Sequence, residues 1–291
     1  MTDRVHVLGA SGRSGSALIA ALLTAGIPVV PVVRSAARWA ATGLAATPRL
    51  ADLGDRNALR STLADATRIV SCAHARHAGA ILSVSPATAR HVFLGSTRKF
   101  TRWPDEHGNG VILGETAFFA SSQAGVMLHP TMIYGAEGED NVRRLAALLA
   151  WLPLVPLPGG GRSLVQPIHQ DDVTRAMVAA LDIAWDGPQA LTICGPSPVT
   201  YATFVHRIAD AAGLRRPCIL PVPAAPLIAL AAIAARLPWL PRIRPEEIRR
   251  LLEDKAFDPA PMRAHLGFTP ISLETGLARS FGGWRKTPLP S

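Results

Sequence analysis

Apolar and polar stretches alternate regularly over the first 135 residues of the chain. The opening run Val5–Leu8 is short and rich in β-branched residues, which is typical of a strand. An alanine- and leucine-rich segment from 16 to 25 follows and predicts a helix. Further apolar runs predict strands at 27–33, 49–51, 67–73, 91–95 and 126–135, and the segments 55–63, 78–90 and 114–122 predict helices. This alternation predicts an α/β fold, a doubly wound parallel (Rossmann) sheet with right-handed crossovers.

The pattern beyond residue 135 is less regular and predicts a smaller C-terminal α+β domain. Helices are expected at 141–152 and from the segment 165–173 to about residue 183, and two more begin near residues 200 and 244. A strand is expected at 190–195 and a loop at 153–162. We expect residues 1–135, completed by 165–195, to form the larger domain. Residues 136–164 and 196–291 would form the smaller one. The apolar stretch 226–240 is shorter than the about 20 residues of a membrane span, so it predicts a buried helix or one that rests on a membrane surface.

Three glycines at a spacing of three stand between the first strand and the first helix. Gly9, Gly12 and Gly15 permit a sharp turn, a close backbone approach to a phosphate, and tight packing of helix on strand. The N-terminus of the helix supplies N–H groups for an anion. We therefore expect this loop, with Ser11, Arg13 and Ser14, to hold the pyrophosphate of a dinucleotide. The alternative is a glycine-rich turn without a ligand.

The residue that ends the second strand indicates which dinucleotide is bound. An acidic residue there would hydrogen-bond the ribose hydroxyls and repel a 2′-phosphate. This chain has Arg34 instead, with Arg13 nearby in the glycine loop, and guanidinium groups suit a phosphate. The sequence favours NADP(H) over NAD(H), although Arg34 can also be an ordinary surface arginine.

Two further strand ends carry candidate cofactor contacts. Asp52 and Leu53 follow the third strand and are placed to meet the adenine. Ala73 and His74 follow the fourth strand and would lie near the phosphates and ribose, because ligands bind at the carboxyl ends of such strands. His74 can contact cofactor or substrate, or be a loop histidine.

Composition narrows the functional classes. The chain has 291 residues and a net charge of +9, but its arginines are scattered and aromatic residues make up only 5%. No basic stripe with stacking residues exists, so nucleic-acid binding is not expected. The three cysteines lie far apart, which argues against disulfides and a zinc site, and no metal is expected. Residues 1–4 run straight into the first strand without a signal peptide, which favours the cytoplasm. Oligomeric state stays open.

Several segments in a fixed order resemble the extended or atypical branch of the short-chain dehydrogenase/reductase superfamily. This branch includes nucleotide-sugar epimerases and dehydratases and an accessory subunit of respiratory complex I. The segments are 9–15, 129–135, 166–173, 195–201, 253–257 and 266–270. The resemblance implies a site in the cleft between the two domains, where Pro130 to Ile133, including Met132, pass the nicotinamide.

The catalytic pair of that superfamily is missing. Its members use Tyr-x-x-x-Lys on one helix face, with a Ser or Thr at the end of the fifth strand. The two tyrosines and three lysines of this chain never have that spacing. Counting back from Glu115, which matches a glutamate common in related sequences, places Val111 at the lysine position and His107 at the tyrosine position. Ser96 and Thr97 retain the hydroxyls. The candidate acid/base is His107, or Ser96 and Thr97 with water, and His107 can also be a residue of an exposed loop.

Two further groups near the predicted cleft favour structural roles. His169 with Asp171 and Asp172 is expected to cap a helix. Tyr134 can face the cleft or be buried and hydrogen-bonded.

Three functions remain open for the chain. The first is an NADP-dependent oxidoreductase with a non-standard acid/base and a small-molecule substrate that the sequence does not identify. The second is a non-catalytic NADPH-binding structural or sensor protein, as in the complex I subunit. The third is a nucleotide-sugar epimerase or dehydratase, against which the missing Tyr and Lys count.

Overall fold

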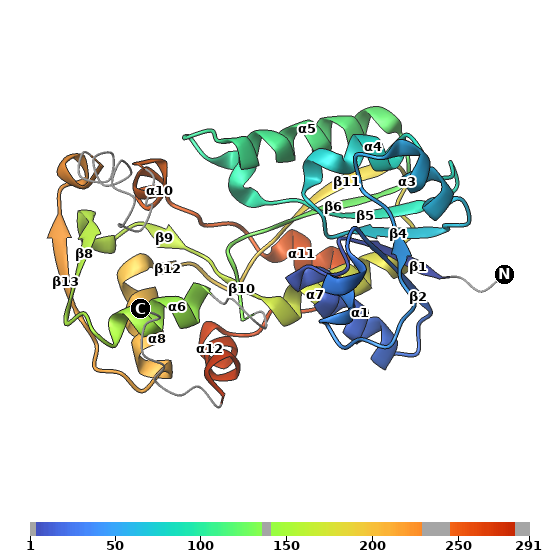
Figure 1. Cartoon of the computed structure of the whole chain (residues 1–291). Helices are drawn as coiled ribbons and strands as arrows, with labels where there is room; N and C mark the ends of the chain where they lie inside the picture. The colour runs from blue at the N-terminus through green and yellow to red at the C-terminus, as the bar shows by residue number, and fades with distance from the viewer. Residues whose placement is uncertain (1–3, 136–140, 229–244, 283–291) are drawn as a thin grey trace.

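A seven-stranded parallel sheet is the centre of the computed structural model, which describes residues 4–135, 141–228 and 245–282 (Figure 1). Its strands, in spatial order, are β11 (Pro188–Ile193), β6 (Gly125–Pro130), β5 (Arg90–Leu94), β4 (Arg68–Ser71), β1 (Val5–Leu8), β2 (Val29–Val33) and β3 (Arg49–Leu50). The chain order reverses between β1 and β4, which makes the carboxyl ends of these two strands the switch point where ligands bind. The predicted Rossmann sheet is confirmed.

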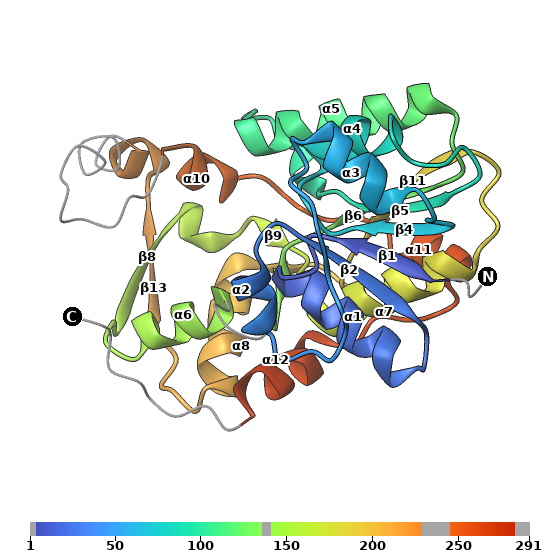
Figure 2. The ribbon, with the colours of Figure 1, turned by 45° about the vertical axis from the view of Figure 1, so that its right-hand side comes forward.

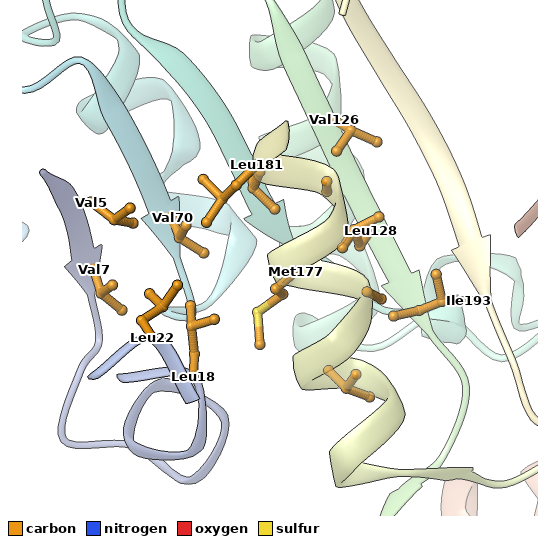
Figure 3. Packing of buried hydrophobic residues seen from close by; sticks show 14 of the residues in the cluster. Val5, Val7, Leu18, Leu22, Val70, Val126, Leu128, Met177, Leu181 and Ile193 are labelled. Atoms are coloured by element: carbon orange, nitrogen blue, oxygen red, sulfur yellow. The ribbon is translucent and has the colours of Figure 1, made fainter. Parts of the chain in front are cut away.

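Helices cover both faces of this sheet (Figures 1 and 2). One face carries α1 (Arg13–Thr24), α7 (Gln170–Asp182) and α11 (Ala260–Leu266), and the other carries α3 (Arg56–Leu63), α4 (Ala78–Leu82) and α5 (Glu106–Ser121). Figure 3 shows Leu18 and Leu22 of α1 and Met177 of α7 packing against strand residues such as Val70 and Leu128, all fully buried. Burial of such apolar area stabilises the layers. The short α2 (Ala36–Ala40) follows β2.

A second, smaller core lies beside the carboxyl edge of the sheet. Phe204 of α8 (Tyr201–Ala211), Val142 of α6 (Asn141–Leu149) and Leu277 of α12 (Leu273–Phe281) belong to it. Around it stand α10 (Pro245–Arg250) and three two-stranded sheets: β7 (Ile133–Tyr134) with β10 (Ile168–His169), β8 (Leu154–Pro158) with β13 (Cys218–Val222), and β9 (Leu164–Val165) with β12 (Val199–Thr200). α11, although late in the sequence, packs on the larger core.

Three expected elements differ from the structure. The helix expected from residue 114 begins eight residues earlier, at Glu106, with the Asp105 side chain accepting a hydrogen bond from the Gly108 N–H at 2.8 Å. The helix expected over 78–90 is shorter: α4 ends at Leu82, and the 3₁₀ helix η1 (Ala75–His77) directly precedes it. The expected loop at 153–162 contains β8, which pairs with β13. Residues 229–240 of the apolar stretch lie outside the described residues.

Candidate functional site

The glycine loop has the geometry that a pyrophosphate requires. Gly9 has φ +71°, and a Cβ there would lie 2.8 Å from the Ala73 backbone nitrogen. A Cβ on Gly15 would lie 2.3 Å from the Gly9 carbonyl oxygen. Gly12 is the N-cap of α1, and no side chain of the described residues caps this helix. The first turn of α1, with Arg13 and Ser14, is therefore open to an anion.

Ser14 also connects α1 to α7 in a way that the sequence does not reveal. Its hydroxyl donates to the Gln170 Oε1 at 3.0 Å, and Gln170 begins α7. The hydroxyl therefore positions the glycine loop, while the Ser14 main chain stays in the first turn of α1.

A cavity of about 220 Å³ adjoins this loop at the ends of β2 and β3. Five residues expected to contact the cofactor line it: Gly9, Ser11, Arg34, Asp52 and Leu53. The Arg34 side chain is 75% exposed and its Nη1 lies 4.0 Å from the Asp52 Oδ2. Arg38 of α2 lines the same cavity, and no sequence motif marks it among the many arginines. The cavity thus combines two guanidinium groups with one carboxylate.

Two histidines meet at a second cavity, of about 250 Å³, at the ends of β4 and β5. The His74 Nε2 lies 3.1 Å from the His107 Nδ1, and the rings are edge-to-face at 4.5 Å. Ala73 and Val111 also line this cavity. The interpretation of His107 as an exposed loop residue is wrong, because it lies half-buried in the first turn of α5. The position of His107 on α5 aims it at the carboxyl edge of the sheet.

The surroundings keep both histidines neutral near pH 7. Burial, with His107 close by, lowers the pKa of His74 to about 4. Burial and the nearby Arg98 guanidinium lower the pKa of His107, which Asp105 only partly opposes. Asp105 itself is shared between Arg98 and Arg250.

The position that the family uses for lysine holds a packed valine. Val111 is 1% exposed and belongs to the apolar core between α5 and the sheet. One turn further along α5, Glu115 accepts hydrogen bonds from the Lys99 Nζ at 2.5 and 2.6 Å and lies 3.1 Å from the His129 Nε2. The His129 Nδ1 in turn accepts from the Ser96 N–H at 3.2 Å. Lys99 was not predicted, because its partners are distant in sequence.

A third cavity, of about 460 Å³, lies between the two cores. Ser96, Thr97 and Met132 line it on the sheet side. The Ser96 Oγ accepts from the Arg98 N–H at 3.1 Å, and the Thr97 hydroxyl donates to the Pro130 carbonyl oxygen at 3.1 Å, so both hydroxyls hold the loop in place. Thr131, which the sequence did not single out, lines the cavity with a buried hydroxyl that has no hydrogen-bond partner within 4–135, 141–228 and 245–282.

The opposite wall of this cavity comes from residues near α10. Arg250, Leu252, Glu253 and Lys255 line it, together with Phe257. The Glu253 carboxylate accepts from the Thr101 hydroxyl at 2.8 Å and from the Arg102 N–H at 2.6 Å. Glu253 therefore attaches this wall of the cavity to the segment that follows β5 of the sheet.

The remaining candidates have structural roles. The His169 Nδ1 accepts from the Asp171 N–H at 3.2 Å and caps α7, as predicted. Asp172 accepts from the Ile271 N–H at 2.9 Å. Tyr134 is 2% exposed and packs edge-to-face on His169. Within the described part of the chain no cluster of His, Cys, Asp or Glu is arranged to hold a metal, and no helix is long and apolar enough to cross a membrane.

Comparison with known proteins agrees with the fold and with the glycine loop. Residues 9–111 match a family model described as NAD(P)H-binding. The uncharacterized protein Rv2047c of Mycobacterium tuberculosis is 29% identical over 222 residues, a match that covers 72% of this chain but 23% of that protein. The chain therefore spans about a quarter of the length of this relative.

Two solved structures share the architecture over nearly the whole chain. The NADPH-dependent quinone oxidoreductase QOR2 of Escherichia coli, in complex with NADPH, has a TM-score of 0.73, with 17% identity over 96% of this chain and 100% of that one. The UDP-glucose 4-epimerase of Thermotoga maritima, with UDP-glucose, has a TM-score of 0.72, with 15% identity over 95% of this chain and 97% of that one. These likenesses confirm the fold that the resemblance implied, and the family model identifies an NAD(P)H-binding domain at residues 9–111.

Proposed function

We propose that this chain, which has the short-chain dehydrogenase/reductase fold and an NAD(P)H-binding domain at residues 9–111, is an NADPH-dependent oxidoreductase of a small carbonyl or quinone substrate. His107 would donate a hydrogen bond to the substrate oxygen that gains negative charge, in place of the tyrosine of the superfamily. The observation that carries the proposal is the contact of His74 with His107 beside a cavity at the ends of β4 and β5.

The chain's own residues fit the cofactor. The turn packs so closely at Gly9 and Gly15 that a Cβ at either position would collide with the backbone, and the start of α1 offers N–H groups to the pyrophosphate. Arg34 and Arg38 would bind the 2′-phosphate, which favours NADP(H) over NAD(H). When bound, NADPH supplies the hydride.

The substrate oxygen would lie in the cavity that His74 and His107 line, and the rest of the substrate would extend toward the cavity between the two cores. The Thr131 hydroxyl is buried there without a partner, so a polar atom of a ligand would satisfy it. QOR2 is an NADPH-dependent quinone oxidoreductase, and its fold matches 96% of this chain. A planar carbonyl compound is therefore the first substrate class to test.

The buried Val111 favours one rival function. A valine neither lowers the pKa of an acid nor binds a ribose, so a non-catalytic NADPH-binding role fits this position well. An epimerase or dehydratase of nucleotide sugars is less favoured, because the base that such reactions need at the tyrosine position would have to be His107.

Oxidation of NADPH, followed by its absorbance with a panel of quinones and carbonyl compounds, separates these functions. We expect turnover that falls by about a hundredfold or more in His107→Ala, as for loss of a hydrogen-bond donor to a developing oxyanion. The matched control is His265→Gln, since His265 is exposed on α11. Tight NADPH binding without turnover on any substrate would overturn the oxidoreductase and favour the non-catalytic role.

A further inference from the structure

We infer that His74 is a positioning residue that fixes His107 as a neutral imidazole with its proton on Nε2. In this form His107 donates a hydrogen bond to a substrate oxygen that gains negative charge. The inference rests on the proposed function for its catalytic meaning, but the tautomer itself follows from hydrogen bonds alone.

The chain of hydrogen bonds starts at the main chain. The Arg76 N–H donates to the His74 Nδ1 at 3.1 Å, so this nitrogen is an acceptor and carries no proton. A neutral His74 therefore has its proton on Nε2. That N–H points at the His107 Nδ1, 3.1 Å away, which must accept it. The proton of a neutral His107 is then on Nε2.

The same geometry disfavours a charged His107. An imidazolium carries protons on both nitrogens, so its Nδ1–H would face the N–H of His74. Either the contact or the Arg76 hydrogen bond would have to break. The pair therefore works best with both rings neutral.

The cations around the pair also disfavour a charged imidazole, and the carboxylates of Glu106 and Asp105 oppose them only in part. Arg76 beside His74 is paired with Glu106 at 2.8 Å, and both side chains are substantially exposed. On the other side, Arg98 from the 3₁₀ helix η2 (Thr97–Phe100) and Arg250 from α10 share the single carboxylate of Asp105. His77 lies one turn from His74 and its charged form would repel that of His74.

A glycine on α5 makes room for the pair. A Cβ on Gly110 would lie 2.7 Å from the His74 Cε1, so only a glycine at this position leaves the ring where it is. The glycine lies one turn after His107 on the same helix. It therefore gives a way to displace His74 without removing a titratable group.

A neutral imidazole suits a reaction that puts negative charge on oxygen. Its N–H is a hydrogen-bond donor that stabilises developing charge, and water supplies the proton afterwards. This function needs Nε2–H toward the substrate, because the other tautomer would present a lone pair to the oxygen. The positioning role of His74 is therefore to exclude that tautomer.

The tautomer is measured directly by two-bond ¹H–¹⁵N correlation spectra of the full chain labelled with ¹⁵N-histidine, without substrate. The signals that disappear in His107→Asn identify His107. We expect the Nε2–H pattern from pH 6 to pH 8 in the wild type, although an ordinary histidine titrates near about 6.5. An Nδ1–H pattern or an imidazolium at pH 6 would overturn the inference.

Gly110→Ala and its control Asn109→Ala, an exposed position on the same helix, test the role of His74. Alanine is a better helix former than glycine, so α5 is expected to persist. In Gly110→Ala we expect signals of both tautomers of His107, and the pKa of His107 should lie above its wild-type value. The kcat should fall at least about tenfold. Asn109→Ala should match the wild type in every respect, and identical spectra for both variants would overturn the positioning role.

The two proposals fail in different ways. If no substrate is turned over but the Nε2–H pattern is found, the oxidoreductase is wrong and the tautomer is right. If turnover depends on His107 but its ring titrates like an ordinary histidine, the oxidoreductase stands and the role of His74 is wrong. His74→Leu, which removes the donor without enlarging the side chain, should shift the His107 signals as Gly110→Ala does.

Discussion

Two arginines line the cavity at the ends of β2 and β3, and at the residue scale they carry the proposed preference for NADP(H). Arg34 ends the second strand, and Arg38 stands in α2, where the Ser35 Oγ accepts its N–H at 3.3 Å. Asp52 faces Arg34 at 4.0 Å and would repel a phosphate by itself. Two guanidinium groups against one carboxylate leave net positive charge for a 2′-phosphate.

Arg34→Ala and Arg38→Ala should each lower the affinity for NADPH about tenfold, with little change for NADH. A charge-assisted hydrogen bond is worth about 1.5–3 kcal/mol, and exposure to water reduces that value here. Fluorescence titrations with both dinucleotides measure the ratio of the two dissociation constants. Arg60→Ala, on the exposed side of α3, serves as the control. An unchanged ratio in both variants would contradict the assignment of NADP.

The residues that could be predicted are those whose partners are close in sequence. The glycine loop is recognisable because Gly9 and Gly15 act within one turn and one helix start. His74 and His107 lie 33 residues apart, so only the crossover from β4 to α5 brings them together. Arg38 could not be found either, because one arginine among many has no distinctive pattern, and Thr131 was included only as part of the segment from Pro130 to Ile133.

At the scale of elements, α5 shows why helix starts are difficult to predict. Gly108, Gly110 and Gly114 lower the intrinsic helix propensity of its first half, so the sequence pattern places the start at residue 114. The structure uses these glycines for close contacts: a Cβ on Gly114 would lie 1.9 Å from the Ala75 carbonyl oxygen. Tertiary packing therefore outweighs local propensity, and it carries His107 into the site.

A buried ionic network holds α5 against the sheet, and Glu115 is its centre. Glu115→Gln should lower the free energy of unfolding by about 2 kcal/mol or more, because the Lys99 ammonium, 13% exposed, would lose its counter-charge. Urea unfolding followed by circular dichroism measures the difference. Glu106→Gln is the matched control, since its side chain is 86% exposed and such pairs contribute about 0–1 kcal/mol. Equal losses in the two variants would show that the network is not stabilising.

At the scale of the whole molecule, hydrogen bonds and an ion pair join the two walls of the cavity between the two cores. The loop after α10 reaches the sheet domain through Glu253, which accepts from Thr101 and Arg102, and through the ion pair of Arg250 with Asp105. These contacts join segments about 150 residues apart in sequence, so they could not be predicted from local patterns. They set the width of the cavity in which the substrate would bind.

Glu253→Ala should loosen this connection while the cofactor edge stays intact. We expect faster amide hydrogen exchange over residues 96–105, because the Arg102 N–H loses its acceptor and the Thr101 hydroxyl its partner. NADPH affinity should change less than twofold or so, since the glycine loop lies on the other side of β4 and makes none of these bonds. The control is Glu274→Ala, which removes an exposed ion pair with Arg207 between α12 and α8. Unchanged hydrogen exchange over 96–105 would mean that the two cores are held together without Glu253. The shape of the cavity would then depend on the packing of Phe100 against Phe257, whose ring centroids lie 5.8 Å apart.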